Sequence, residues 1–156
     1  MEYAIQAWCP WTVGDKEVLE AVQRRAVKAV ANLRGKTYND RLRELNLDTL
    51  EDRRQRGDLI QAYRTLSNKD NVDPSTFFDM YESKEGGVIT RQKGGLKNIV
   101  PNSWKGEVRH NFWSVRVVAP WNALPDQVKG VDTLDSFKNS LDNIRERERK
   151  NRVGQQ

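Results

Sequence analysis

Three arginines and a glycine recur along residues 49–66 (TLEDRRQRGDLIQAYRTL) at spacings that suit one face of a helix. Guanidinium groups match phosphate oxygens in charge and geometry, and glycine leaves backbone that another surface can approach closely. At about 100° per residue, one side of this helix would carry Leu50, Arg53, Arg54, Gly57, Gln61 and Arg64. We name this set the arginine stripe, and it predicts an exposed face that binds a phosphate backbone.

The same residues have a purely structural interpretation. Arg54 with Asp58, and Asp52 with Arg56, have the i,i+4 spacing of ion pairs on a solvated helix. Gly57 would then be a packing contact. Both interpretations stay open on the sequence alone.

The other chemistry that this chain can perform is restricted by its composition. Cys9 is the only cysteine and His110 the only histidine, so a disulfide within the chain is impossible. One cysteine and one histidine are too few for a Cys/His zinc site, and they leave a single possible histidine for a Ser-His-Asp triad. The carboxylates are expected at helix caps or in turns. We therefore predict no catalytic residue, no metal ligand and no cofactor in this chain.

Length and charge indicate one domain with a mild basic excess. The chain has 156 residues, a net charge of +5, a pI near 9.4 and a mean hydropathy of −0.85. Five Trp, four Tyr and four Phe argue against disorder despite this polarity. No apolar run approaches the length of a membrane span and no signal peptide is visible, so we expect an intracellular protein of unknown compartment without a membrane partner.

Three helices are expected in the first half of the chain. The spacing predicts one over residues 15–33, with Asp15 at its start, Gly35 beyond its end and a broad apolar face. Arg24 and Lys28 lie opposite that face, where they can meet a phosphate backbone or form a solvated surface with a Glu20–Arg24 ion pair. Residues 37–45 and 49–66 follow as a short and a long helix, a helix-turn-helix pattern that any helical hairpin shares. Thr37, with Asp40 three residues on, is expected to cap the first, and Asp48 or Thr49 the second. The expected apolar face comprises Val18, Leu19, Val22, Ala26, Ala29, Val30 and Leu33.

The second half is more mixed. Residues 88–91 and 96–100 are strand-sized between paired glycines and predict a small β-hairpin. Residues 112–124 are apolar all round, with Pro120 expected to kink or end the helix and Arg116 needing a carboxylate partner. Residues 132–144 predict an amphipathic helix, and residues 145–156 have no apolar face and should fray.

These elements predict a mainly α chain: a helical thumb-like bundle, a small central β-hairpin and a C-terminal amphipathic helix. The expected segments are 1–69 (helical), 70–110 (loop and hairpin), 111–144 (further helices) and 145–156 (disordered charged tail). Residues 1–11 begin without a helix-start signal, as if an element were entered in its middle. We therefore expect a longer parent protein, with Ile5, Trp8 and Trp11 exposed where its preceding domain would have packed.

Five segments in order resemble the C-terminal end of reverse transcriptases from non-LTR retrotransposons of the jockey and CR1 type. The resemblance spans about residues 2–144. It implies the thumb and following region of an RNA-directed DNA polymerase, whose thumb grips the primer–template duplex through its backbone. The segments are EYAIQAWCPW (2–11), VQRRAVKAV (22–30), TLEDRRQRGDLI (49–60), RVVAPWNALP (116–125) and FKNSLD (137–142).

One departure from this family is decisive for activity. The polymerase holds its Mg²⁺ ions with two aspartates in an F/Y-x-D-D segment, and this chain contains no Asp-Asp pair. Pro120 also stands where relatives would have a polar helix residue. We therefore expect a catalytically incomplete fragment that binds an RNA/DNA or DNA duplex through its phosphates and whose other partner is the missing palm domain.

Two other functions remain open. A standalone helix-turn-helix module would bind DNA selectively, although residues 39–43 and 49–56 offer few base-reading side chains. A protein-interaction module would use its basic face to bind an acidic partner. The duplex-binding residues predicted from the sequence are Arg24, Lys28, Arg53, Arg54, Gly57 and Arg64.

Overall fold

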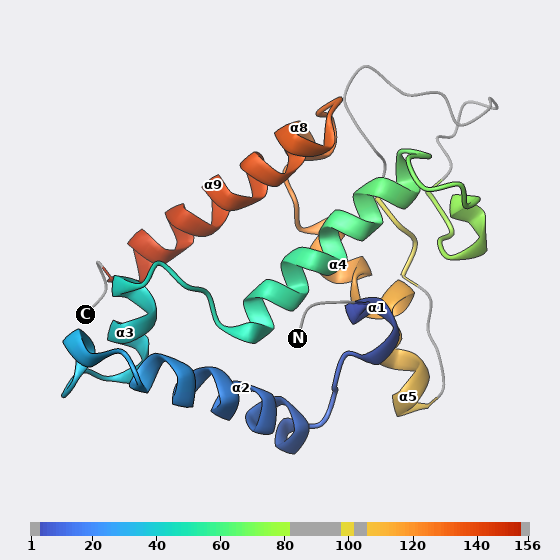
Figure 1. Cartoon of the computed structure of the whole chain (residues 1–156). Coiled ribbons are helices and arrows are strands. Elements are labelled where there is room, and N and C mark those ends of the chain that lie inside the picture. Colours follow the sequence, from blue (N-terminus) through green and yellow to red (C-terminus); the bar gives the residue numbers. More distant parts are fainter. Residues whose placement is uncertain (1–3, 82–97, 102–105, 154–156) are drawn as a thin grey trace. The chain divides into compact units, whose positions relative to one another are not determined.

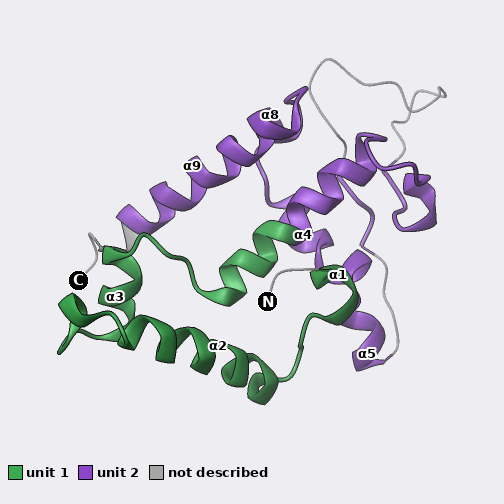
Figure 2. Cartoon of the chain, viewed as in Figure 1, with its two compact units in different colours: residues 1–57 green, residues 58–156 purple. Residues whose placement is uncertain are grey.

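The chain is mainly helical, as the sequence predicts (Figure 1). A computed structural model describes residues 4–81, 98–101 and 106–153, with side chains as far as residue 150. It divides into two compact units, residues 1–57 and 58–156 (Figure 2), and the boundary falls inside one long helix. Within the described residues, no helix combines the length and the apolar character needed to cross a membrane.

Unit 1 contains α1 (Ile5–Trp8), α2 (Val13–Lys28), the 3₁₀ turn η1 (Ala31–Leu33), α3 (Tyr38–Glu44) and the first half of α4 (Leu50–Leu66). Unit 2 contains the rest of α4, the 3₁₀ turn η2 (Pro74–Thr76), α5 (Glu107–His110), α6 (Trp113–Arg116), α7 (Val118–Asn122), α8 (Asp126–Lys129) and α9 (Leu134–Val153). The predicted segments 1–69, 70–110, 111–144 and 145–156 divide the chain by composition, whereas these units divide it by packing.

Threonine hydroxyls cap the N-termini of four of the helices. Thr12, Thr37, Thr49 and Thr133 each accept a hydrogen bond from the backbone N–H three residues later. That N–H has no partner inside the helix. The predicted cap of α3 is confirmed, and Thr49 is the one of the two candidate caps that begins α4. Helix α2 is capped by Thr12 rather than by Asp15, and it ends at Lys28, before the turn η1.

The predicted apolar face of the 15–33 helix is largely wrong. The side chains of α2 that are buried are Gln23 and Val27. Val18 and Val22 are 66% and 41% exposed. The reason is that α2 presents a polar side to its neighbours in unit 1, as described below. Ile5, expected to be exposed, is buried, whereas Trp8 and Trp11 are exposed as predicted.

Unit 2 has a continuous aromatic and aliphatic core. The rings of Tyr63 and Phe137 stack with their centroids 4.3 Å apart, and Trp121 and Phe137 are fully buried. The Tyr63 hydroxyl donates to the carbonyl oxygen of Val131 at 2.6 Å, which satisfies the one polar group of this ring. The buried members of this core are Leu59, Ala62, Tyr63, Leu66, Phe78, Ile99, Trp113, Val117, Val118, Trp121, Val128, Phe137 and Leu141.

The predicted β-hairpin falls mostly outside the described residues. In the described part, Met80 and Ile99 form an isolated antiparallel bridge rather than a strand. The amide of Asn122 binds both backbone groups of Ile99, accepting from its N–H at 2.9 Å and donating to its C=O at 2.8 Å. A side chain thus satisfies Ile99 as a neighbouring strand would.

Arg116 has the carboxylate partner that the sequence demands. Its Nε and Nη2 donate to the two oxygens of Asp58 at 2.8 and 2.9 Å, and Nη1 donates to the carbonyl of Asn111. The two side chains are 19% and 8% exposed. This bidentate geometry, with a further hydrogen bond, is what a buried charge pair requires.

The helical run of residues 112–124 is interrupted, as expected from Pro120. It forms two short helices that break at Val117, next to Arg116, whose C=O lacks the N–H donor that Pro120 cannot supply. Pro120 itself lies in the first turn of α7. N–H groups in a first turn have no helical partner, so proline is tolerated there.

The prediction that residues 145–156 fray is wrong for most of this segment, because α9 continues to Val153. Extending a formed helix needs no new nucleation, and a Glu146–Lys150 ion pair of 2.8 Å supports it.

Removing the partner of Arg116 should destabilise unit 2. Asp58→Ala should cost about 3 kcal/mol, because the guanidinium would stay buried without its carboxylate. Lys16→Ala breaks an exposed pair with Glu51 and should cost less than about 1 kcal/mol. Urea unfolding followed by tryptophan fluorescence measures both. Equal effects would show that the Asp58–Arg116 pair behaves as a surface pair.

Candidate nucleic-acid interface

Two polar side chains of α2 connect this helix to α3 and to the start of α4 by hydrogen bonds. Glu20 accepts hydrogen bonds from the Tyr38 hydroxyl and from the backbone N–H of Leu50, the latter at 3.1 Å. Gln23 donates to the carbonyl of Asp48 at 2.8 Å and to the Tyr38 hydroxyl at 3.2 Å. One side of α2 is therefore fixed to α3 and to the start of α4, which leaves its opposite side free for a ligand.

The phenol of Tyr38 is held in its neutral form by these contacts. Burial first, and then the hydrogen bond to Glu20, raise the pKa of Tyr38 from 10.0 to about 12. The phenol stays a hydrogen-bond donor to Glu20 across the physiological range.

Arg24 lies beside this network on the exposed side of α2. Its Nη1 donates to Glu17 at 2.7 Å, and its guanidinium carbon lies 5.2 Å from the centroid of the Tyr38 ring. The hydrogen bond to Glu17 and the charge of that carboxylate raise the pKa of Arg24. The predicted Glu20–Arg24 pair is wrong, because Glu20 is occupied by Tyr38 and Leu50.

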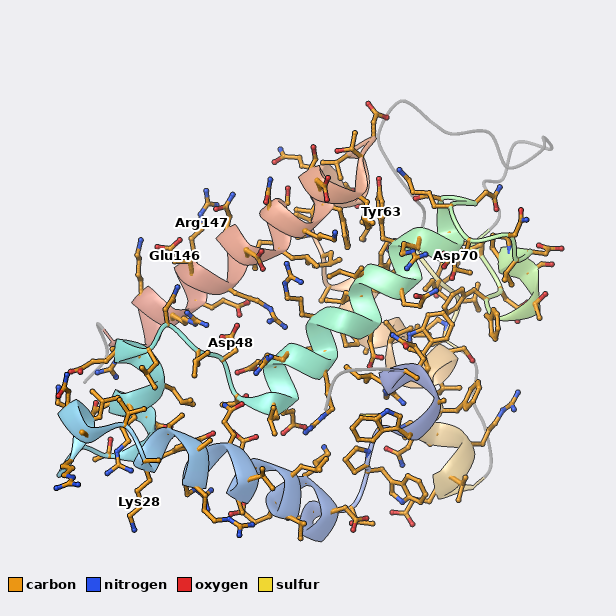
Figure 3. The ribbon with its side chains drawn as sticks, viewed as in Figure 1. Lys28, Asp48, Tyr63, Asp70, Glu146 and Arg147 are labelled. Carbon is orange, nitrogen blue, oxygen red and sulfur yellow. The ribbon has the colours of Figure 1, made fainter. Side chains whose placement is uncertain are left out.

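Lys28 and Arg25 accompany Arg24 on the surface. At about 100° per residue, Arg24, Lys28 and Arg25 fall within about 100° of the helix circumference, and all three are exposed. Arg24 is at the edge of this arc beside the buried Val27, whereas Arg25 is opposite the buried residues. Lys28 projects away from α3 (Figure 3), and neither Lys28 nor Arg25 forms an ion pair with a carboxylate in the described part of the chain. We name Arg24, Arg25 and Lys28 the basic cluster.

The arginine stripe of α4 is not an exposed face. Arg54 is 3% exposed and its Nη1 has no hydrogen-bond partner in the described residues. Leu50 is buried, and Arg53 is half-buried with Nη1 3.5 Å from the Gln23 amide oxygen. The expectation of an exposed stripe is wrong for Leu50 and Arg54, because the side of α4 that carries them packs inward.

The three remaining members of the stripe also have partners, and Gln61 donates to Thr65 and Asp70. A Cβ on Gly57 would lie 3.4 Å from the Ile5 side chain, so Gly57 makes the packing contact that the structural interpretation predicted. Arg64, in unit 2, is bound to Asp70 at 2.6 Å, and Figure 3 shows Asp70 on the segment that follows α4. Of the six predicted residues, the structure brings Arg24 and Lys28 together on an exposed surface.

Arg25 is the member of the basic cluster that the helical spacing did not single out. A simple signal was present, since residues 24–43 hold seven Lys or Arg and one Asp. Their exposed members continue from the basic cluster to Arg34, which follows η1. Local charge density would have placed the basic surface at the end of α2 rather than on α4.

A cavity of about 200 Å³ lies in unit 2. Its lining is mainly apolar but includes Asp79, His110 and Ser114. Acyl transfer needs a hydrogen bond from nucleophile to base, and the described contacts include none between Ser114 and His110. Nor do three His, Cys, Asp or Glu side chains gather as a metal site within the described ranges.

Comparison with known protein families, with curated proteins and with solved structures finds no match to this chain. The resemblance to non-LTR reverse transcriptases therefore remains a proposal from the sequence segments.

Gly57→Ala distinguishes the two interpretations of that glycine. Alanine is the better helix former by about 1 kcal/mol, and its Cβ would make an ordinary contact with Ile5. We expect a raised melting temperature and unchanged duplex affinity. A loss of affinity without a loss of stability would show instead that nucleic acid approaches the backbone at Gly57.

Tyr38 should make the stability of unit 1 sensitive to alkaline pH. Its pKa in the folded chain, about 12, exceeds the unfolded value near 10. Between these values the unfolded chain loses the proton first, so stability is intact below pH 10 and falls as pH rises toward 12. Tyr38→Phe should flatten this fall in urea titrations at successive pH values. An unchanged slope would show that the phenol ionises normally.

Proposed function

We propose that this chain binds the backbone of a nucleic acid duplex through the basic cluster of α2. The observation that carries the proposal is the grouping of Arg24, Arg25 and Lys28 on one exposed side of a helix whose other side is fixed by Glu20 and Gln23. A rigid row of cations binds a polyanion by displacing its counterions.

The resemblance supports the same surface. The segment VQRRAVKAV (22–30), one of the five that carry the likeness, contains the whole basic cluster. We propose that the chain is the thumb and following region of a non-LTR retrotransposon reverse transcriptase, and that a palm domain is its natural partner. The chain's own carboxylates do not provide the paired aspartates of the Mg²⁺ site, so polymerisation is not proposed for it.

The chemistry of the cluster favours a duplex and disfavours base recognition. Single-strand binders present aromatic rings on which bases stack. The aromatic ring beside the cluster, Tyr38, is covered on one face by Arg24. Phosphate contacts position a ligand without reading its sequence, so binding should be indifferent to sequence.

A protein-interaction module is the alternative function. It is favoured by the exposed apolar side chains of Val18 and Val22, which lie on the outer side of α2 near the cluster. Such a partner would be acidic and would also cover these valines.

Substitution of the two cluster cations that form no ion pair in the described residues tests the proposal. Lys28→Gln with Arg25→Gln should weaken binding to a labelled DNA or RNA/DNA duplex equally for different sequences. The plot of log affinity against log salt should flatten by about 0.9 for each phosphate that the variant no longer neutralises. Fluorescence anisotropy over about 50 to 200 mM salt gives both quantities.

Arg147→Gln with Lys150→Gln serves as the control, because it removes the same charge from exposed positions on α9 (Figure 3 labels Arg147). If the control pair weakens binding as much, net charge alone is responsible. Absence of duplex binding by the unaltered chain, or strong preference for one sequence, would contradict the proposal.

A further inference from the structure

We propose that Glu17 competes with nucleic acid for Arg24 and thereby sets how tightly the basic cluster binds. This inference rests on the proposed backbone binding and adds the residue that regulates it. Glu17 stands two helical turns before Arg24 on the same side of α2, and its Oε1 accepts from Arg24 Nη1 at 2.7 Å.

The ion pair is open to exchange. The Arg24 and Glu17 side chains are 45% and 60% exposed, and exposed pairs of this kind contribute little to stability. Opening the pair therefore costs little folding stability, so the carboxylate and a phosphate can compete for Arg24. Guanidinium binds phosphate with two parallel hydrogen bonds, whereas Glu17 accepts through one oxygen from Nη1.

The guanidinium of Arg24 has a second contact besides Glu17. It lies over the Tyr38 ring at 5.2 Å, and the Tyr38 hydroxyl is fixed by Glu20 and Gln23. Because Glu20 also binds the N–H of Leu50, this support extends to the start of α4. When Glu17 is displaced, the cation remains held where a phosphate can bind it.

Charge explains how Glu17 lowers affinity. Paired with Glu17, Arg24 adds no net charge to the cluster, and the carboxylate also repels an approaching phosphate. Arg25 and Lys28 then supply most of the attraction. Without the Glu17 charge, Arg24 becomes a third phosphate contact and releases a further counterion on binding.

Unit 1 contains a closely matched second pair for comparison. Lys16 and Glu51 are also 2.7 Å apart, with side chains 36% and 63% exposed. Glu51→Gln removes the same charge as Glu17→Gln, and from the same unit. Lys16 lies on the side of α2 that faces α4, so Glu51 is not part of the basic cluster.

The experiment measures duplex affinity against salt for the full chain, for Glu17→Gln and for Glu51→Gln. Glutamine keeps an acceptor for Arg24 and removes the charge. Glu17→Gln should bind more tightly and steepen the salt slope by about 0.9. Raising the salt from about 50 to 200 mM should therefore lower the affinity of Glu17→Gln about threefold more than it lowers the affinity of the unaltered chain. Glu51→Gln should leave the slope unchanged.

A double-mutant cycle assigns the effect to Arg24. In the presence of Arg24→Gln, Glu17→Gln should no longer steepen the salt slope beyond the Glu51→Gln control, because the third phosphate contact is absent and only the direct repulsion by Glu17 is removed. Circular dichroism and thermal unfolding of each variant confirm that the helices persist.

The outcomes separate this inference from the proposed function. Equal slopes for Glu17→Gln and Glu51→Gln, with normal binding by the unaltered chain, overturn the inference alone. A steeper salt slope of Glu17→Gln that survives Arg24→Gln also overturns it. If neither the unaltered chain nor Glu17→Gln binds a duplex, the proposed function fails and the inference fails with it.

Discussion

Unit 1 depends on the acceptor oxygens of Glu20 and the amide of Gln23. Its buried apolar side chains are few within the described residues: Ile5, Val27, Leu33, Leu42 and Leu50. Hydrogen bonds from one side of α2 therefore fix the direction of α3 and the start of α4. Because these bonds are directional, they orient α2 about its own axis in a way that apolar contacts alone would not. Because Glu20 and Gln23 turn toward α3 and α4, the basic cluster lies on the exposed part of α2.

Unit 2 uses the same principle inside a larger apolar core. Asp58 and Arg116 neutralise each other where both are largely buried, and Asn122 satisfies the two backbone groups of Ile99. In each case a buried polar group finds a partner far away in the sequence, as low dielectric surroundings require. The aromatic core supplies the non-directional part of the stability, and these contacts specify which segments meet.

Local chemistry made much of the fold predictable, whereas long-range pairing did not. The cap at Thr37 depends on residues three apart, and the need of Arg116 for a carboxylate follows from its apolar neighbours; both predictions are confirmed. The apolar spacing that includes Val22 was misleading, because hydrogen bonds rather than burial orient α2. In the candidate site, the exposure of Arg24 and Lys28 was expected for a reason that is wrong, because the apolar residues placed opposite them are themselves largely exposed. The burial of Arg54 was not expected, since periodicity shows which residues share a face without showing what covers that face.

The division of the chain between Gly57 and Asp58 limits how it can be dissected. Helix α4 has 17 residues, and separating the units would leave eight of them in one piece and nine in the other. Both lengths lie below the roughly 12 to 15 residues at which a helix is even marginally stable alone in water. The first piece would keep the cap at Thr49, whereas the second would begin at Asp58 with new unpaired N–H groups beside the carboxylate that Arg116 requires. Limited proteolysis within α4 would thus remove a structural element that both products share, instead of releasing two intact modules.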